Sequence, residues 1–220
     1  GEVLKNVTLQ ICKGELVGVT GPVGGGKSTL LLAILGELQP TNGSVRALSP
    51  ELQDREANDL AEGGCVGVAP QSPWILGATL RENILLGSRF EPERYRRVIF
   101  ACALESDISS FPARDLTHIG ERGINLSGGQ KARLSLARAA YSRAEVVLLD
   151  DPLAPLDLPV RRHVWQHCIA GLLAQRTRVM VMHDAAALTS CARVLYVDNG
   201  CVHEQHQPPQ SLHQPSLSPP

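Results

Sequence analysis

Short apolar runs separated by stretches of helical periodicity extend along most of the chain. Residues 16–20 are almost wholly apolar, and residues 145–150 are apolar between their ends, as is typical of strands buried on both faces of a parallel sheet. Residues 3–11 alternate loosely between apolar and polar side chains, which also indicates a strand. The pattern predicts strands at 3–11, 16–20, 65–69, 145–150, 178–182 and 194–198.

Apolar residues at helical spacing fill the intervals between these strands. Residues 28–38 predict a helix that stops before Pro40, and residues 161–173 predict another. The whole stretch 72–142 is helical in pattern and includes an amphipathic helix at 130–141. Strands that alternate with helices predict an α/β fold with a largely parallel sheet.

This pattern also suggests how the chain is divided. We expect one domain over residues 1–204, with a helical subdomain at 72–143 inserted into it. Residues 205–220 are rich in Pro, Gln, Ser and His with almost no charge, and we expect a disordered tail there. Residues 48–64 are polar and irregular, which predicts a loop or an insertion.

Composition narrows the class of protein. Apolar residues make up 43% of the 220 residues, which is enough for a core. The net charge of −1 and the pI near 6.7 argue against a nucleic-acid partner, because proteins that bind the phosphate backbone carry a basic excess. The six cysteines show no CxxC spacing, so reduced thiols in the core are expected. No apolar run approaches the ~18 residues that a membrane span needs.

A glycine-rich segment lies between the strand at 16–20 and the helix at 28–38. Its glycines let backbone N–H groups turn toward phosphates, and the following helix adds its positive N-terminal end. In such a loop Lys27 reaches the β- and γ-phosphates of ATP, and the Ser28 hydroxyl ligates Mg²⁺. The predicted ATP-binding segment, which fits G-x-x-x-x-G-K-[ST], consists of Gly21, Pro22, Val23, Gly24, Gly25, Gly26, Lys27 and Ser28, with Thr29 next to it.

Two acidic residues close the apolar strand at 145–150. A carboxylate at the position of Asp150 holds Mg²⁺ beside the phosphate loop, often through water. Asp151 is a candidate general base that orients the attacking water. The other interpretation of Asp151 is a cap or turn residue ahead of Pro152.

The pentapeptide Leu126-Ser127-Gly128-Gly129-Gln130 precedes the helix at 130–141, and here the sequence resembles the ATP-binding cassette (ABC) ATPases. It is similar to their signature, a second anion cradle with Ser127 as N-cap donor and exposed glycine amides. The resemblance implies that Ser127, Gly128, Gly129 and Gln130 contact the γ-phosphate of an ATP held by a partner domain. Two cassettes would then enclose two ATP molecules head to tail.

Further positions resemble the landmarks of that family in the same order. Gln71 matches the glutamine that contacts Mg²⁺ or the water and senses the transmembrane domain. Glu121 lies in a segment similar to the one that faces the coupling helices. Asp157 matches the aspartate at the dimer interface, and His183 matches the switch histidine that contacts the γ-phosphate. A polar loop residue is the alternative interpretation for both Gln71 and His183.

The resemblance extends from about residue 3 to residue 203 and is closest to the first nucleotide-binding domain of the C subfamily, the multidrug-resistance-associated type. It implies a P-loop NTPase core with a mostly parallel sheet, a small antiparallel β region and an inserted helical subdomain. It also implies ATP and Mg²⁺ as ligands, and a second cassette and transmembrane domains as partners. The chain is accordingly expected at the cytoplasmic face of a membrane. Trp74 lies in one of the matching stretches and is either a core aromatic or a contact to a coupling helix.

Three features depart from the family pattern. Asp151 stands where active members have Glu, and a carboxylate withdrawn by over ~1 Å can cost about a hundredfold in rate. Pro155 stands where a small non-proline residue is usual, and it fixes φ and removes a donor at the dimer interface. Residues 3–21 contain no aromatic residue to stack on adenine, which suggests that this platform lies upstream in a longer polypeptide.

These departures leave three hypotheses. The first is the ATPase domain of an exporter whose own site is weakly hydrolytic. The second is a regulatory nucleotide-binding module of a channel or receptor, which Asp151 favours. The third, a soluble ABC ATPase of DNA repair or translation, lacks support because neither a heptad run nor a second phosphate loop is present. The arginine-rich stretch at 93–97 indicates a solvated helix face rather than an anion site.

Overall fold

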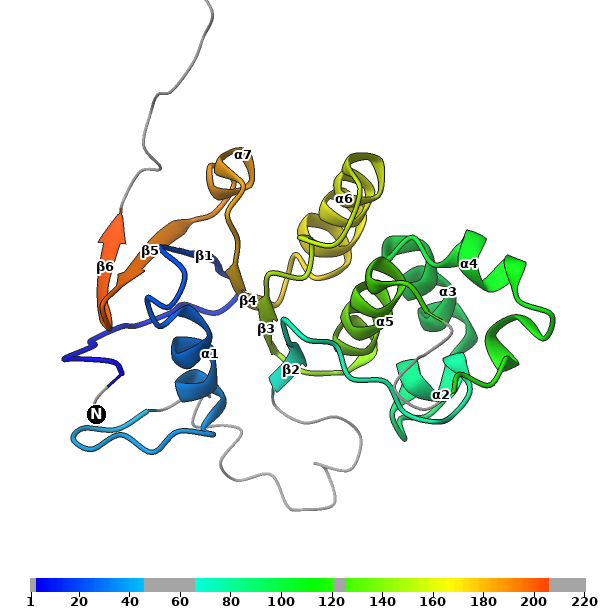
Figure 1. Cartoon of the computed structure of the whole chain (residues 1–220), viewed down its shortest axis with the longest axis horizontal. Coiled ribbons are helices and arrows are strands. Elements are labelled where there is room, and N and C mark those ends of the chain that lie inside the picture. The colour runs from blue at the N-terminus through cyan, green and yellow to red at the C-terminus, as the bar shows by residue number, and fades with distance from the viewer. Residues whose placement is uncertain (1–2, 46–65, 121–125, 206–220) are drawn as a thin grey trace, which may run out of the picture.

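The computed structural model describes residues 3–45, 66–120 and 126–205. The predictions for residues 48–64, for Glu121 and for the tail beyond residue 205 lie outside these ranges. Figure 1 shows a sheet on one side of the molecule and a group of helices on the other.

Six strands form one sheet in the described part of the chain (Figure 1). They are β1 (Leu16–Thr20), β2 (Val66–Ala69), β3 (Val146–Asp150), β4 (Thr177–Val181), β5 (Arg193–Asp198) and β6 (Cys201–Gln205). Their order is β2-β3-β4-β1-β5-β6, and only β6 runs antiparallel to its neighbour. The fold class is confirmed: the protein is α/β with a mostly parallel sheet and a small antiparallel pair.

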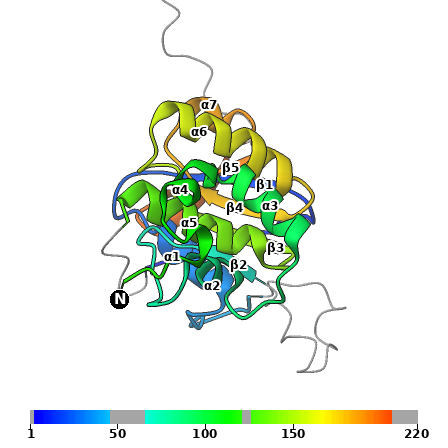
Figure 2. The same ribbon diagram turned by 90° about the vertical axis from the view of Figure 1, so that its right-hand side faces the viewer.

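The helices cover the two faces of this sheet. Figure 2 shows the helical group in front of the sheet, with α6 and α7 above it. The described helices are α1 (Lys27–Leu35), α2 (Leu80–Leu85), α3 (Pro92–Ala101), α4 (Glu105–Ser110), a 3-10 helix (Arg114–Leu116), α5 (Gly128–Tyr141), α6 (Leu158–Val164), the π-helix η5 (Trp165–Leu172) and α7 (Ala185–Leu188).

Alternation along the central strands divides the core into two clusters. In β1, Val17 and Val19 pack with Leu30 and Leu31 of α1, whereas Leu16 packs with the residues of α3, α5 and η5. β3 and β4 alternate in the same way. Successive side chains of a strand point to opposite faces, so a strand buried on both faces must be apolar throughout. This explains why the runs at 145–150 and 178–182 were recognisable.

Residues 3–11 do not form the predicted strand. Leu4, Val7, Leu9 and Ile11 pack on the cluster of α1, as the alternation suggested. However, the backbone of residues 3–11 does not join the sheet. Lys5 N donates to Gly200 O at 2.8 Å, but no series of strand-pairing hydrogen bonds extends from this contact. The alternation of apolar residues therefore predicted correctly which side chains pack against the core. It did not predict correctly that the backbone would pair with another strand. The strand β6, in contrast, was not predicted, because it carries polar residues such as His203 and Glu204 on an edge of the sheet.

Three predicted helices have different bounds from those expected. α1 ends at Leu35, because Gly36 adopts φ 88° and its N–H caps the carbonyls of Leu32 and Ala33. The helix expected at 161–173 begins earlier, at Leu158, because Asp157 caps it, and its second half is the π-helix η5. The helix at 130–141 likewise begins two residues earlier than expected, at Gly128.

Arg138 of α5 ties the helical group together from the inside. It is only 5% exposed, and it donates hydrogen bonds to the carbonyl oxygens of Asn83 (2.8 Å) and Trp74 (3.2 Å). Its guanidinium lies 3.6 Å from the centroid of the Trp74 ring. Trp74 itself is 44% exposed, so it is not the core aromatic that was one of two predictions. Trp165 is partly buried and packs against the larger core cluster.

The described cysteines fit the predicted core only in part. Cys102 and Cys168 are buried with their sulfur atoms 3.8 Å apart, and all described cysteines are free thiols. Burial and the neighbouring Cys168 raise the pKa of Cys102, which keeps it protonated. Cys12 is exposed, contrary to the expectation that the thiols lie in the core.

Candidate nucleotide site

The strand order places several predicted site residues at one edge of the sheet. β3, β4 and β1 are adjacent parallel strands, so their carboxyl ends meet at the same edge. Val181 of β4 is in register with Asp150 of β3 and with Val19 of β1. The segments that follow these strands hold Asp151, His183 and the phosphate loop. In open α/β sheets, this edge is where ligands bind.

The phosphate loop packs closely against the end of β5. A side chain on Gly21 would collide with the carbonyl oxygen of Val197, and a Cβ on Gly25 would lie 2.6 Å from the same atom. Gly24 has open space around its Cα, and Gly26 adopts φ 108° as the N-cap of α1. Glycine at positions 21 and 25 therefore lets the loop lie directly on β5, and the backbone of this loop forms the candidate phosphate cradle.

The side chains of the loop are accessible where a phosphate would bind. The Lys27 ammonium donates to the carbonyl oxygens of Gly21 (3.0 Å) and Pro22 (2.7 Å) and contacts no carboxylate among the described residues. Ser28 is exposed, Thr29 is half-buried, and Val23 is 97% exposed at the tip of the loop. The Lys27 ammonium is thus held against its own loop by two carbonyl oxygens. It pairs with no acidic side chain among the described residues, so its charge is available to a bound anion.

Asp150 ends β3, and Asp151 follows it in an unusual backbone conformation. Asp151 has φ 50°, a left-handed conformation that Asp tolerates better than most residues. Burial raises the pKa of the Asp151 carboxyl and the charge of Asp150 adds to this, while His183, Arg161 and Lys27 lower it. The charges of Lys27 and His183 thus both act on the Asp151 carboxyl.

Gln71 and His183 are exposed residues that follow the ends of strands. Gln71 comes two residues after Ala69 of β2, which is in register with Leu149 of β3. Continued beyond the ends of the two strands, this register places Gln71 opposite Asp151. His183 comes directly after Met182, whose N–H donates to Val19 O at 3.0 Å.

The predicted signature residues cap helix α5. Ser127 is the N-cap residue: its hydroxyl accepts from Gln130 N at 3.2 Å, and Ser127 N donates to Gln130 Oε1 at 2.8 Å. Gln130 Nε2 donates to Asp107 of α4 at 2.9 Å, and Arg133 pairs with the same carboxylate at 2.6 Å. Sequence reasoning missed Asp107, because a single Asp in a short polar helix carries no spacing signal.

Asp157 is the N-cap residue of α6 and accepts from Val160 N at 2.9 Å. The carbonyl oxygen of Pro155, in the same loop, lies against Gly129: a Cβ there would come within 3.2 Å of it. The loop around Asp157 and the signature are therefore neighbours in this chain. The hydrogen bonds of Ser127 and Gln130 stay within the helical group and do not reach the phosphate loop.

The donor set fits Mg-ATP better than it fits a metal held by protein alone. No group of three or more His, Cys, Asp or Glu side chains comes together as a metal site in the part of the chain that is described. Mg²⁺ typically uses one or two carboxylates together with waters and substrate phosphates. Asp150, Ser28 and Gln71 carry carboxylate, hydroxyl and amide oxygen atoms, which are the donor types that such a partial set would need.

None of the described helices is long and apolar enough to cross a membrane. This finding concerns residues 3–45, 66–120 and 126–205 only.

Comparison with known proteins gives the family. The family described as "ABC transporter" matches residues 4–154, more than half of the chain. The chain is 42% identical to "ATP-binding cassette sub-family C member 4" of Homo sapiens over 197 residues, which is 90% of this chain and 14% of that protein. It is 39% identical over 198 residues to "Cystic fibrosis transmembrane conductance regulator" of Danio rerio, covering 90% of this chain and 12% of that protein.

A fungal relative, "ABC-type transporter cicA" of Emericella nidulans, is 44% identical over 200 residues, which cover 91% of this chain and 13% of the relative. The chain thus spans only about an eighth of the length of the curated relatives it matches. The cradle, the strand order and these matches agree, and the chain belongs to the ABC transporter family, with relatives of the multidrug-resistance-associated C subfamily.

Proposed function

We propose that this chain is the first ATP-binding cassette of an exporter of the C subfamily, and that it binds Mg-ATP at the edge formed by β1, β3 and β4. The observation that carries the proposal is the cradle at Gly21 and Gly25 with the Lys27 ammonium held over it, and with Asp150 and Asp151 at the end of β3. Backbone N–H groups and the N-terminus of α1 would bind the phosphates. Domain limits of 1–204, with 72–143 as the helical insertion, remain part of this proposal.

Each residue of the site has a proposed role. Lys27 would contact the β- and γ-phosphates, and Ser28, Asp150 and Gln71 would hold Mg²⁺, which when bound neutralises developing phosphate charge. Asp151 would orient the attacking water and accept its proton, and His183 would contact the γ-phosphate. Gln130 and the amides after Ser127 would serve an ATP held by a second cassette, with Asp157 at the interface between the two.

Nucleotide affinity tests the binding part of the proposal. Replacing Lys27 by Ala removes the ammonium group of the phosphate loop. We expect the affinity of the 220-residue chain for Mg-ATP to fall at least about tenfold. The reason is that hydrogen bonds to a charged group contribute roughly 1.5–3 kcal/mol. The control is Lys13→Ala, which removes an ammonium paired with Glu145 on the surface. Equal affinities for the two variants, measured by calorimetry, would contradict the proposal.

We further propose that the nucleotide site of this cassette hydrolyses ATP slowly. The Asp151 side chain has one methylene fewer than Glu, so its carboxylate does not reach the position that a Glu carboxylate would occupy. Asp151→Glu is therefore expected to raise the single-turnover rate by roughly tenfold or more, since misplacement by ~1 Å can cost about a hundredfold. The comparison variant is Asp151→Asn, which cannot accept a proton and should not raise the rate. A wild type as fast as Asp151→Glu would rule out the slow site.

Asp151 also supports a second candidate function, a regulatory module that dimerises on ATP without pumping. A site that hydrolyses ATP slowly keeps its ATP bound for longer than an active site does. Prolonged binding suits a module that is regulated by ATP. ATP-driven transport against a concentration gradient, measured with the full-length gene product, separates the two. Uphill transport favours the exporter ATPase, whereas ATP-dependent behaviour without uphill transport favours the regulatory module.

A further inference from the structure

A pocket of about 490 Å³ lies where the loop after α2, the first half of α3 and the end of α5 meet. It is separate from the phosphate loop, and no residue of the proposed nucleotide site lines it. Its lining is dominated by four arginines from three segments: Arg89 in the loop, Arg94 and Arg97 on α3, and Arg143 after α5.

The framework of this pocket is fixed by Tyr141. The buried hydroxyl of Tyr141 donates to the carbonyl oxygen of Arg89 at 2.7 Å and accepts from the N–H of Glu91 at 2.9 Å. Arg94 lies with its guanidinium 5.0 Å from the centroid of the Tyr141 ring, and it donates to Ser142 O at 2.8 Å. The loop and the first turn of α3 are thereby attached to the end of α5, which fixes the backbone positions from which the arginine side chains extend.

The charges in the pocket are not balanced. Glu91 Oε1 lies 2.6 Å from Arg143 and 3.7 Å from Arg94, so one carboxylate is shared by two guanidinium groups. Glu93, the second acidic residue of the lining, pairs with Arg96, which is outside it. Arg89 and Arg97 have no hydrogen-bond or ion-pair partner within the described residues.

Crowding of like charges is also visible at Arg94. Burial lowers the pKa of Arg94, and the charges of Arg143 and Arg97 lower it further, while Glu91 raises it. Independent solvated side chains on one helix face would not converge in this way from three segments. This convergence supports an anion site at this surface, beside the solvated helix face that the sequence indicates for residues 93–97.

We propose that the pocket binds a tetrahedral phosphate group, either free or as a small monoester, through Arg89, Arg97 and Arg143. Guanidinium groups match phosphate oxygens with paired N–H donors, and they bind more strongly when they are oriented in advance. Glu91 holds Arg143 in an ion pair, and the phosphate would supply the negative charge that Glu91 alone does not. The site is independent of ATP binding at the phosphate loop.

The test uses the 220-residue chain with Lys27→Ala in every sample, so that binding at the phosphate loop is weakened equally throughout. Arg89→Gln with Arg97→Gln removes two exposed cations from the pocket, and Arg114→Gln with Arg162→Gln removes two exposed cations elsewhere. Both pairs change the net charge by the same amount. Inorganic phosphate and O-phosphoserine are titrated separately by calorimetry at low and at high salt.

We expect the pocket pair to weaken phosphate binding by about tenfold or more and the control pair to leave it within about twofold, with weaker binding at high salt. Tighter binding of O-phosphoserine would identify a monoester as the ligand, and tighter binding of inorganic phosphate would identify the free ion. Equal losses in both pairs would show a response to net charge only and would overturn the proposal. Absence of saturable binding in the parent chain would overturn it as well.

Discussion

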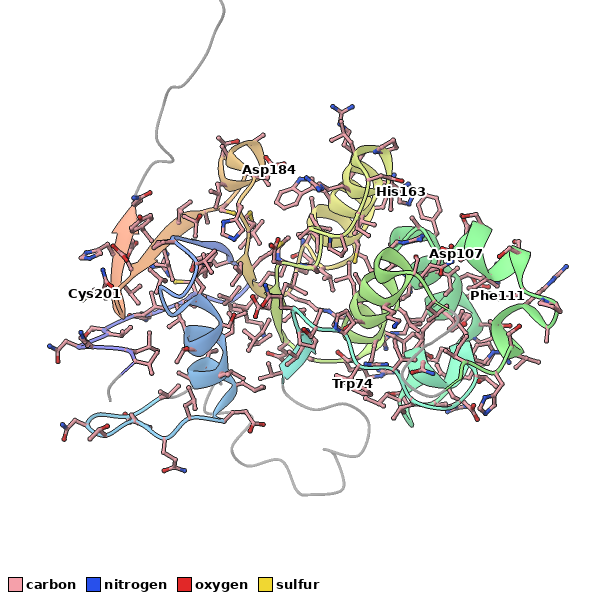
Figure 3. All side chains as sticks on the ribbon, in the orientation of Figure 1. Trp74, Asp107, Phe111, His163, Asp184 and Cys201 are labelled. Atoms are coloured by element: carbon pink, nitrogen blue, oxygen red, sulfur yellow. The ribbon has the colours of Figure 1, made fainter. Side chains whose placement is uncertain are left out.

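The side-chain amide of Gln130 is fixed at both ends, because Nε2 donates to Asp107 Oδ1 at 2.9 Å while Oε1 accepts from Ser127 N at 2.8 Å. An isolated glutamine amide can turn over and exchange its donor and acceptor. The Asp107 carboxylate can only accept hydrogen bonds, so it pairs with the amide nitrogen of Gln130. The amide oxygen is then left facing Ser127. Asp107 lies within the helical group (Figure 3), and it thus sets the geometry of the predicted signature without belonging to it.

Replacing Asp107 by Ala should loosen the start of α5. We expect hydrogen exchange at the N–H groups of Ser127 and Gln130 to become roughly tenfold faster, because losing an N-cap costs about 0.5–2 kcal/mol. Exchange followed by NMR or mass spectrometry measures this locally. Asp107→Asn provides a milder variant, since its amide oxygen can still accept from Gln130.

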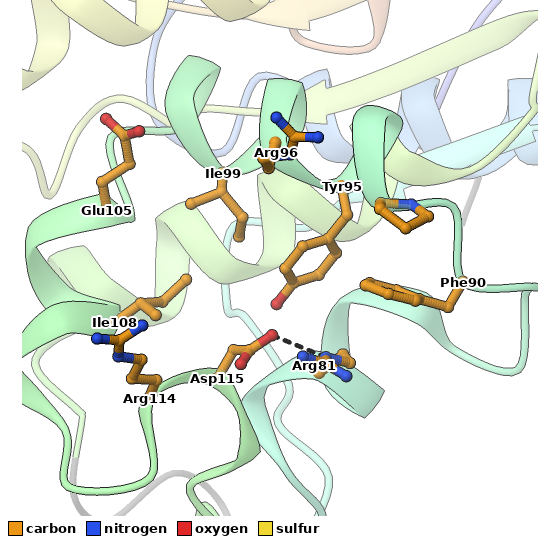
Figure 4. A pocket seen from close by; sticks show the side chains of 10 residues that line it. Arg81, Phe90, Tyr95, Arg96, Ile99, Glu105, Ile108, Arg114 and Asp115 are labelled. Carbon is orange, nitrogen blue, oxygen red and sulfur yellow. Dashed lines mark hydrogen bonds and ion pairs between the residues drawn. The ribbon is translucent and has the colours of Figure 1, made fainter.

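Asp115 offers the matched control for that experiment. Its carboxylate lies 2.7 Å from Arg81, an ion pair that the dashed line in Figure 4 marks, and it is buried to almost the same extent as Asp107. Asp115→Ala should destabilise the helical group without changing exchange at Ser127. Equal acceleration in both variants would mean that Asp107 acts only through general stability.

Replacing Asp151 by Asn should stabilise the nucleotide-free protein at neutral pH. Burial raises the pKa of Asp151 above its ordinary 3.8, so the folded state holds the proton more tightly than the unfolded state does. The favourable contribution of protonated Asp151 is present below pH 3.8 and is lost as the pH rises through the raised pKa. Asn carries no charge to desolvate and tolerates the left-handed backbone equally well.

The difference between Asp151→Asn and wild type should therefore grow between acid and neutral pH and then stay constant. Urea denaturation midpoints at a series of pH values measure it. Asp198→Asn, at the end of β5 in the same sheet, is the control for a general effect of removing an acid. A difference that shrinks as the pH rises would contradict the burial of the Asp151 charge.

Replacing Arg138 by Met should cost about 2–4 kcal/mol of unfolding free energy, because buried acceptors lose their donor and part of the packing is lost. The acceptors are the carbonyl oxygens of Asn83 and Trp74 and the amide oxygen of Asn83. Burial lowers the pKa of Arg138 to about 10, which still leaves it charged at neutral pH. Lys should not rescue the loss, since one ammonium cannot replace the fork of donors.

Arg162→Met is the matched control, because Arg162 is exposed on α6 and makes no hydrogen bond or ion pair within the described residues. Its effect should stay within about 0.5 kcal/mol, as is usual for surface substitutions. Urea denaturation of both variants decides the outcome, and equal losses would show that the contacts of Arg138 contribute little.

Much of the fold could be predicted because burial leaves a local pattern. β3 and β4 are buried on both faces, so their sequences are continuous apolar runs and were recognised with bounds close to the observed ones. The segment 3–11 shows the limit of that reasoning. Its alternating residues are partly buried, but a backbone ladder depends on a neighbouring strand, which no local pattern specifies.

The sequence by itself determined the chemistry of the phosphate loop, since glycines, Lys27 and Ser28 act through residues adjacent in the chain. Only the tertiary structure decided which distant residues join them. The order β3-β4-β1 brings Asp151 and His183 toward Lys27, and packing of α4 on α5 brings Asp107 to Gln130. These contacts join residues far apart in sequence, and the free energy that selects them comes from burial of the whole core rather than from any one segment.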